Sequence, residues 1–166
     1  MKYLSRNTTV GAILLLTALP ITAQAQTCTA STRPDSRYTV MTNGTEVKDN
    51  VTGLIWQRCS LGQTWSGTTC IGTVSHYNWQ QALTATNAIG NGYRLPNIKE
   101  LNSLVDDACY SPAINERLFP NTAGEPYWSS SPSADTGAVW IVEFYNSYTY
   151  PSSKSDSGYV RAVRSQ

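Results

Sequence analysis

The chain has 166 residues, with 12 basic side chains, 11 acidic side chains and one histidine, for a formal net charge of +1. This near-neutral balance excludes the broad basic surface that binding to nucleic acid requires. The length suits one domain with a real core and is too short for two ordinary domains.

The N-terminus has the parts of a secretory signal peptide. Lys2 and Arg6 precede an apolar run over residues 10–19, and Ala23 and Ala25 suit the cleavage site. The apolar run is about half the length that a membrane-spanning helix needs. We therefore predict a signal peptide over residues 1–25 and a secreted, periplasmic or cell-surface protein that does not span the membrane. Loss of Lys2 and Arg6 leaves ten basic against eleven acidic side chains.

All four cysteines follow the expected cleavage site. An even number in an oxidising compartment indicates two disulfides, and sequence alone allows three pairings. We favour Cys59 with Cys70, because the polar segment between them contains glycines and can double back, which leaves Cys28 for Cys109. A zinc site is the alternative, but the chain has no CxxC pair and a single histidine. We therefore expect neither a metal nor a cofactor.

The first predicted elements are an extended arm and short strands. Residues 26–37 are polar and contain a proline, which is typical of an arm that a disulfide pins down. Three strands are expected next, over residues 38–41, 46–48 and 53–57. Asn43-Gly44 between the first two predicts a tight hairpin turn.

Two short helices follow in the prediction. The first begins after Asn78, and Gly90 or Gly92 can end it. The second begins after Asn97, which has Glu100 three positions later in the spacing of a capping box. Its apolar face is formed by Ile98, Leu101, Leu104 and Val105. Both helices are short, so they need a sheet to pack on.

Residues 111–128 contain three prolines and little periodicity, which predicts a long ordered excursion over the surface. Strands resume at residues 127–130, 138–145 and 159–164. In the run at 138–145, both alternating sets of residues are apolar except for Glu143, as in a central strand that is covered on both faces. The element order predicts a compact, disulfide-bridged α+β domain over residues 26–166, with an antiparallel sheet and two short helices.

Seven short motifs occur in an order that resembles the DUF1566 family, also called the Lcl C-terminal domain after a collagen-like adhesin. They are TGLIWQ at 52–57, WQQAL at 79–83, YRLPNIKEL at 93–101, SPAIN at 111–115, FPNT at 119–122, YWSSS at 127–131 and YVRAVR at 159–164. The resemblance implies a fold related to the C-type lectins and an adhesive role. Its namesake binds glycosaminoglycans as a trimer, which allows a homo-oligomer here. This chain lacks the collagen-like repeat and an obvious basic cluster.

Several conspicuous side chains have structural interpretations. Four tryptophans are predicted to anchor the core because each lies in an apolar periodic run, namely Trp56, Trp79, Trp128 and Trp140. We expect Arg94 to pair with a carboxylate, and Glu100 to be either that partner or a helix cap. The adjacent acids Asp106 and Asp107 are interpreted as a solvated face.

The candidate binding site lies near the C-terminus. Residues 129–159 include nine serines and four tyrosines, a composition typical of recognition surfaces. An ordinary solvated loop has a similar composition, but tyrosines crowded into FYNSYTYP favour recognition. The predicted ligand-binding residues are Tyr145, Asn146, Tyr148, Tyr150, Asp156 and Tyr159.

We predict an exported, adhesin-like protein that binds a glycan or a cell-surface protein through these loops, and no enzyme. The only histidine, His76, lies in a polar run, and the chain has no GxSxG elbow or phosphate-binding loop. The alternatives are a subunit or accessory of a surface appendage, a display protein diversified by a retroelement, and a carbohydrate-active hydrolase. The hydrolase would need a pair of acids such as Glu125 and Glu143 to meet.

Overall fold

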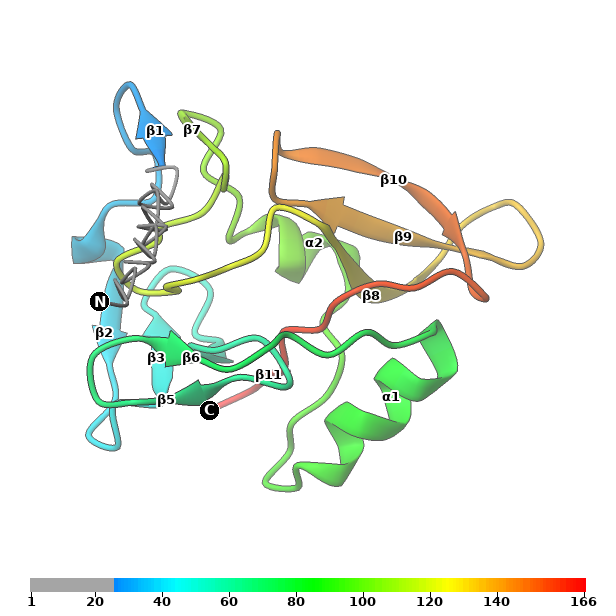
Figure 1. Ribbon diagram of the computed structural model, residues 1–166, viewed down its shortest axis with the longest axis horizontal. Helices are drawn as coiled ribbons and strands as arrows, with labels where there is room; N and C mark the ends of the chain where they lie inside the picture. The colour runs from blue at the N-terminus through cyan, green and yellow to red at the C-terminus, as the bar shows by residue number, and fades with distance from the viewer. Residues whose placement is uncertain (1–25) are drawn as a thin grey trace, which may run out of the picture.

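The computed structural model describes residues 26–166 (Figure 1). The predicted signal peptide, residues 1–25, lies outside the described residues. Within residues 26–166, no helix is long and apolar enough to cross a membrane.

Within residues 26–166, the strands form four small antiparallel sheets. The largest has the order β11-β4-β3-β2, and a three-stranded sheet has the order β10-β9-β8. Two pairs, β1-β7 and β5-β6, complete the set. The strands are β1 Thr27–Cys28, β2 Tyr38–Val40, β3 Glu46–Asp49, β4 Ile55–Gln57, β5 Thr64–Trp65, β6 Cys70–Ile71, β7 Cys109–Tyr110, β8 Pro126–Pro132, β9 Ala138–Glu143, β10 Tyr148–Ser153 and β11 Val163–Arg164. With the two helices, they confirm the predicted α+β class.

Both predicted helices begin with a capping box. Asn78 precedes α1, Trp79–Ala88, and its side chain accepts a hydrogen bond from the backbone N–H of Gln81 at 2.9 Å. Asn97 precedes α2, Ile98–Asn102, and accepts from the N–H of Glu100 at 3.0 Å. These caps satisfy backbone donors that have no partner inside the helix. A short 3-10 helix, Asp35–Arg37, lies in the N-terminal arm.

The second helix is shorter than its apolar pattern suggests. It ends at Asn102; Leu104 follows in a turn and Val105 in an isolated β-bridge to Ile114, although both are buried. Hydrogen bonds from the N–H of Leu104 to the carbonyl of Leu101 and from the N–H of Val105 to that of Asn102 tighten the chain at this point. Tight turns of this kind can direct residues i, i+3 and i+4 to the core as a helix does.

Strand β9 is central in the three-stranded sheet, as predicted. Val139 and Ile141 pack into a core cluster that includes Ala82 of α1. Val142 and the following Phe144 pack into a second cluster. Because alternate residues of a strand point to opposite faces, β9 separates the two clusters and contributes to both.

The excursion over residues 111–128 does not run over the surface, and that prediction is wrong. Ile114 and Phe119 are fully buried, and Phe119 packs edge-on against Tyr38 with ring centroids 5.8 Å apart. Side chains replace secondary structure as partners for this backbone, since Asn115 accepts from the N–H of Leu118 at 3.2 Å. A segment without helical or strand period gives no sign of which side chains point inward.

Two further elements differ from the prediction. Residues 148–153 form strand β10 instead of a loop, because their backbone pairs along the whole length of β9. The strand predicted over residues 159–164 is confined to β11, while Val160 and Ala162 are buried without belonging to a strand. Strand β10 is largely exposed, so it lacks the apolar alternation from which strands are recognised.

Both predicted disulfides are present. Cys28 is bonded to Cys109, and this bond joins β1 to β7. Cys59 is bonded to Cys70 across a loop closed by the β5-β6 pair. The first disulfide fixes the N-terminal arm to the body of the domain, as expected.

Asp106 also holds the arm, which corrects its interpretation as part of a solvated face. Its carboxylate is buried and accepts hydrogen bonds from the N–H and hydroxyl of Thr32, both at 2.9 Å, and from the N–H of Arg33 at 3.2 Å. Asp107 is exposed, in agreement with the prediction. The sequence predicted that only the cysteine fixes the arm. It gave no sign that a buried carboxylate accepts hydrogen bonds from the arm.

Asp106 is expected to make the free energy of unfolding depend on pH in the acidic range. Burial alone would raise the pKa of its carboxyl group, but hydrogen bonds from Ser31, Thr32 and Arg33 outweigh it and lower the pKa. The stabilisation is therefore present above the unfolded pKa of about 3.9 and is lost as the pH falls through the folded pKa. We expect Asp106→Asn to lower the free energy of unfolding at pH 7 by about 1–3 kcal/mol.

Urea denaturation of the wild type and the variant at pH 7 and pH 3 measures this effect. The difference between them should shrink at pH 3, because the Asp106 carboxyl of the unfolded wild type is then largely protonated while the folded carboxylate keeps its charge. Asp107→Asn is the matched control and should have little effect at either pH. A difference that grew on acidification, or equal effects of the two substitutions, would refute the proposed role of Asp106.

Candidate functional site

Three of the six predicted ligand-binding residues lie together on the β9-β10 hairpin. Tyr145, Tyr148 and Tyr150 are 54%, 62% and 37% exposed. Tyr148 and Tyr150 are two positions apart in β10, so their side chains lie on the same face of the sheet. Tyr145 lies in the turn before β10. We call these three residues the tyrosine edge; Figure 1 shows β10 along the border of the molecule.

The other three predicted residues have different surroundings. Asn146 shares the turn with Tyr145, and its Oδ1 atom is shielded from solvent without a hydrogen-bond partner in the described part of the chain. Asp156 accepts from the hydroxyl of Ser152 at 2.7 Å and so fixes the turn after β10. Tyr159 is half-buried and packs on Tyr127, with ring centroids 5.7 Å apart, and does not join the tyrosine edge.

A hollow of about 420 Å³ adjoins Tyr145 and is acidic. Three glutamates line it, Glu116, Glu125 and Glu143. The ion pairs found within residues 26–166 involve none of the three. Their charge is therefore not neutralised by a basic side chain of the described protein. We call this cavity the acidic hollow.

The acidic hollow and the tyrosine edge are electrostatically connected. Tyr148 lies directly opposite Glu143 in the β10-β9 register. Burial and the negative charges of Glu143 and Glu125 raise the pKa of Tyr150. Burial also raises the pKa of Glu116. The Tyr150 hydroxyl thus stays protonated near the carboxylates, so that the surface offers hydrogen-bond donors, aromatic faces and negative charge together.

The hydrolase alternative required Glu125 and Glu143 to meet, and both line the acidic hollow. Pro126, the neighbour of Glu125, pairs with Glu143 in the β8-β9 register, which brings the backbones of the two acids close together. Sequence reasoning missed Glu116, whose only signal was an acidic residue in the turn-rich segment.

The predicted structural residues behave largely as expected. Arg94 donates from two nitrogens to the two carboxylate oxygens of Glu100, at 2.7 and 2.6 Å, which confirms the pair. Trp56 and Trp128 are fully buried core residues, as predicted. Trp79 and Trp140 are only half-buried, and the Nε1 atom of Trp79 donates to the carbonyl of Ser129 at 2.9 Å. The exposed His76 stacks on Tyr159 and lines neither the tyrosine edge nor the acidic hollow.

Sequence reasoning also missed a second cavity, of about 510 Å³, beside the Cys59–Cys70 loop. Trp65 and Tyr93 line it with several amide and hydroxyl groups. The available signal was a tryptophan in a polar, disulfide-closed segment without apolar periodicity. Within residues 26–166, no group of three or more His, Cys, Asp or Glu side chains is placed to hold a metal ion.

These features define a small, disulfide-bridged α+β domain that presents an exposed aromatic edge. The sequence pattern of the Lcl C-terminal domain family matches residues 45–164, and the chain belongs to this family. A comparison with curated proteins found no match.

Proposed function

We propose that the protein is an exported, adhesin-like binding module whose tyrosine edge recognises a ligand on a cell surface. The observation that carries the proposal is the grouping of Tyr145, Tyr148 and Tyr150, all exposed, beside the acidic hollow. Tyrosine offers a large amphipathic contact area at low entropic cost, and grouped exposed aromatics favour an interaction site. The predicted signal peptide and the two disulfides support export.

The charge of the surface favours a protein ligand over an acidic glycan. The unpaired acids Glu116, Glu125 and Glu143 repel the sulfate groups of a glycosaminoglycan and attract lysine or arginine side chains. A basic side chain can also lie over a tyrosine ring, an arrangement worth about 0.5–1 kcal/mol at an exposed site. The ligand we propose is therefore a basic segment of a cell-surface protein.

Binding to two arrays tests the proposal, one of peptides with graded positive charge and one of neutral and sulfated glycans. The oxidised protein should bind the basic peptides, and more weakly as salt rises. Replacing Tyr145, Tyr148 and Tyr150 together by alanine should weaken this binding at least about 30-fold, because the residues at the centre of an interface contribute most of the binding free energy.

Ile71→Ala is the control, because Ile71 is similarly exposed, at 52%, and lies on β6. It should leave peptide binding unchanged. A preference for sulfated glycans, or equal binding by the triple variant, would contradict the proposal. Release of shortened glycans would instead indicate the hydrolase, for which Glu125 and Glu143 would be the acids to replace.

A subunit or accessory of a surface appendage is the second candidate. It is favoured by β10, which within residues 26–166 has a paired neighbour on one side only, in the order β10-β9-β8. An edge strand can accept a strand from another chain. A subunit of this kind would bind none of the free peptides or glycans, so the same arrays separate the two roles.

A further inference from the structure

The second cavity, which we call the Trp65 cleft, shares no lining residue with the acidic hollow or the tyrosine edge. It lies between the β2-β3 turn, the Cys59–Cys70 loop and the segment that follows α1. In Figure 1, β3, β5 and the end of α1 occupy the lower part of the molecule, whereas β10 lies at the top. A ligand in the Trp65 cleft would therefore be independent of one on the tyrosine edge.

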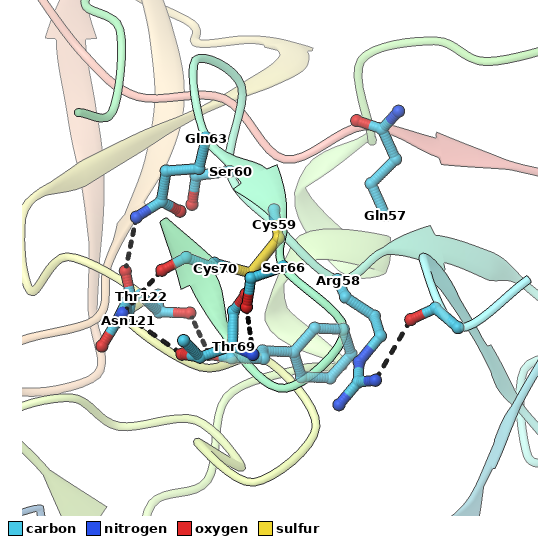
Figure 2. Close-up of a disulfide and its surroundings, with 12 residues drawn as sticks. Gln57, Arg58, Cys59, Ser60, Gln63, Ser66, Thr69, Cys70, Asn121 and Thr122 are labelled. Atoms are coloured by element: carbon cyan, nitrogen blue, oxygen red, sulfur yellow. Dashed lines mark hydrogen bonds between the residues drawn. A yellow bond between two sulfur atoms is a disulfide. The ribbon is translucent and has the colours of Figure 1, made fainter. Parts of the chain in front are cut away.

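The indole of Trp65 is held in place before any ligand arrives. The Arg58 guanidinium lies over the ring, 3.8 Å from its centroid. Arg58 in turn donates to the backbone carbonyls of Leu118 at 2.9 Å and Gly44 at 3.1 Å. Figure 2 shows Arg58 beside the disulfide of the same loop. Little side-chain entropy is left to lose on binding, so the platform is pre-organised.

Gly44 explains how the indole fits against the β2-β3 turn. Its φ angle is +70°, a left-handed conformation in which glycine has no steric penalty. A Cβ atom at this position would lie 3.2 Å from Nε1 of Trp65. The turn therefore supports the edge of the ring and keeps the indole beside the cavity.

The polar side chains that line the cleft have unused hydrogen-bonding capacity. Within residues 26–166, the amides of Gln57 and Asn91 and the hydroxyl of Thr64 make no hydrogen bond. Gln63 donates from Nε2 to the carbonyl of Asn121 at 3.3 Å, as Figure 2 shows, but its Oε1 is shielded from solvent without a partner. Several donors and acceptors thus face one cavity that also contains an aromatic ring.

The charge that lines the cleft is already paired. Among the lining residues within 26–166, the one charged side chain is Glu46, which accepts from Arg164 Nε at 3.0 Å and from Asn43 Nδ2 at 2.7 Å. The hydroxyl of Tyr93 also donates to Glu46. Since the carboxylate is already neutralised by an arginine and two further donors, neither a cation nor a sulfated sugar gains a counter-ion here.

We infer that the Trp65 cleft binds a neutral saccharide. The apolar C–H face of a pyranose ring would lie against the Trp65 indole, while its hydroxyl groups would pair with the free amides of Gln57 and Asn91 and the hydroxyl of Thr64. An aromatic surface with a few convergent uncharged polar groups is the usual chemistry of a pocket for a neutral ligand. An apolar ligand would leave these amides unpaired, and an anionic ligand would find no basic side chain among the residues within 26–166 that line the cleft.

Titration with neutral hexasaccharides tests the inference, using separate oligomers of glucose, mannose, galactose and N-acetylglucosamine and a heparin hexasaccharide as the charged probe. We expect the oxidised protein to bind at least one neutral oligomer and to bind it more tightly than heparin. Trp65→Ala should weaken that binding at least about tenfold, and Asn91→Ala several-fold.

Two further variants keep the result interpretable. Trp65→Phe retains a flat ring against Arg58 and should hold most of the affinity, which separates loss of the platform from loss of the fold. Tyr148→Ala, on the tyrosine edge, should leave saccharide binding unchanged, and Trp65→Ala should leave binding of basic peptides unchanged. Failure of every neutral oligomer to bind, tighter binding of heparin, or binding indifferent to Trp65→Ala would overturn the inference.

Discussion

Replacing Arg161 by alanine is expected to lower the free energy of unfolding by about 3–5 kcal/mol. The side chain is fully buried, and burial lowers the pKa of its guanidinium. It donates to the carbonyls of Gln57, at 3.0 Å, and Arg58, and to the hydroxyls of Ser60 and Thr122, at 3.2 and 2.7 Å. Its removal leaves four acceptors, three of them in fully buried bonds, without this donor and an empty space beside them.

Urea denaturation measures the effect, and two variants show its origin. Arg161→Met refills much of the space but supplies no donor, so it should recover less than half of the lost stability. Arg117→Ala removes an arginine that is 86% exposed and pairs with Asp35, and should change stability by less than about 1 kcal/mol. Near-equal effects of Arg161→Ala and Arg117→Ala would show that the buried hydrogen bonds contribute little.

Arg161 also links the two cavities. Ser60 lines the Trp65 cleft, whereas Thr122 lines the acidic hollow. One guanidinium bonds to both side chains, and the hydroxyl of Ser60 is bonded to that of Tyr127 at 2.6 Å. A single buried group thus positions a wall of each candidate site, so Arg161 variants should impair both kinds of binding together, unlike the local variants.

Features that depend on neighbouring residues were accessible from the sequence. The caps at Asn78 and Asn97 need only a partner three residues later, and both formed. The pairing of Cys59 with Cys70 was predictable because the two cysteines flank a short polar loop. Once they are paired, Cys109 is the partner that remains for Cys28. Apolar residues in both alternating sets of positions, which form the two faces of a strand, identified β9 as a central strand. In each case the information lies within one element or one loop.

Features that depend on packing between distant segments were not accessible. The inward side chains of residues 111–128 follow no period, and Asp106 gains its partners from an arm more than seventy positions earlier. Glu125 and Glu143 line one hollow because β8 pairs with β9, which composition cannot show. Trp65 becomes part of a cleft through Arg58 and Gly44. The composition of residues 129–159 located exposed tyrosines, while the acids beside them required the tertiary structure.

Replacing Cys28 and Cys109 together by serine is expected to lower the free energy of unfolding by about 4–5 kcal/mol, the entropic value for so long a loop. The disulfide joins residues 81 positions apart and so restricts the unfolded chain over half of its length. The Cys59–Cys70 loop spans only 11 positions. The corresponding double serine variant should therefore lose less, about 3 kcal/mol.

Denaturation of the two double variants under identical conditions tests this order. The folded arm keeps other attachments, since Asn115 donates to the carbonyl of Arg33 at 2.9 Å and to Asp35 at 2.8 Å, and Asp106 binds Thr32. The variant without Cys28 and Cys109 should thus remain native-like at low denaturant, with the arm in place. A larger loss in the variant without Cys59 and Cys70 would mean that holding Trp65 and Arg58 in the folded loop outweighs the restriction of the unfolded chain.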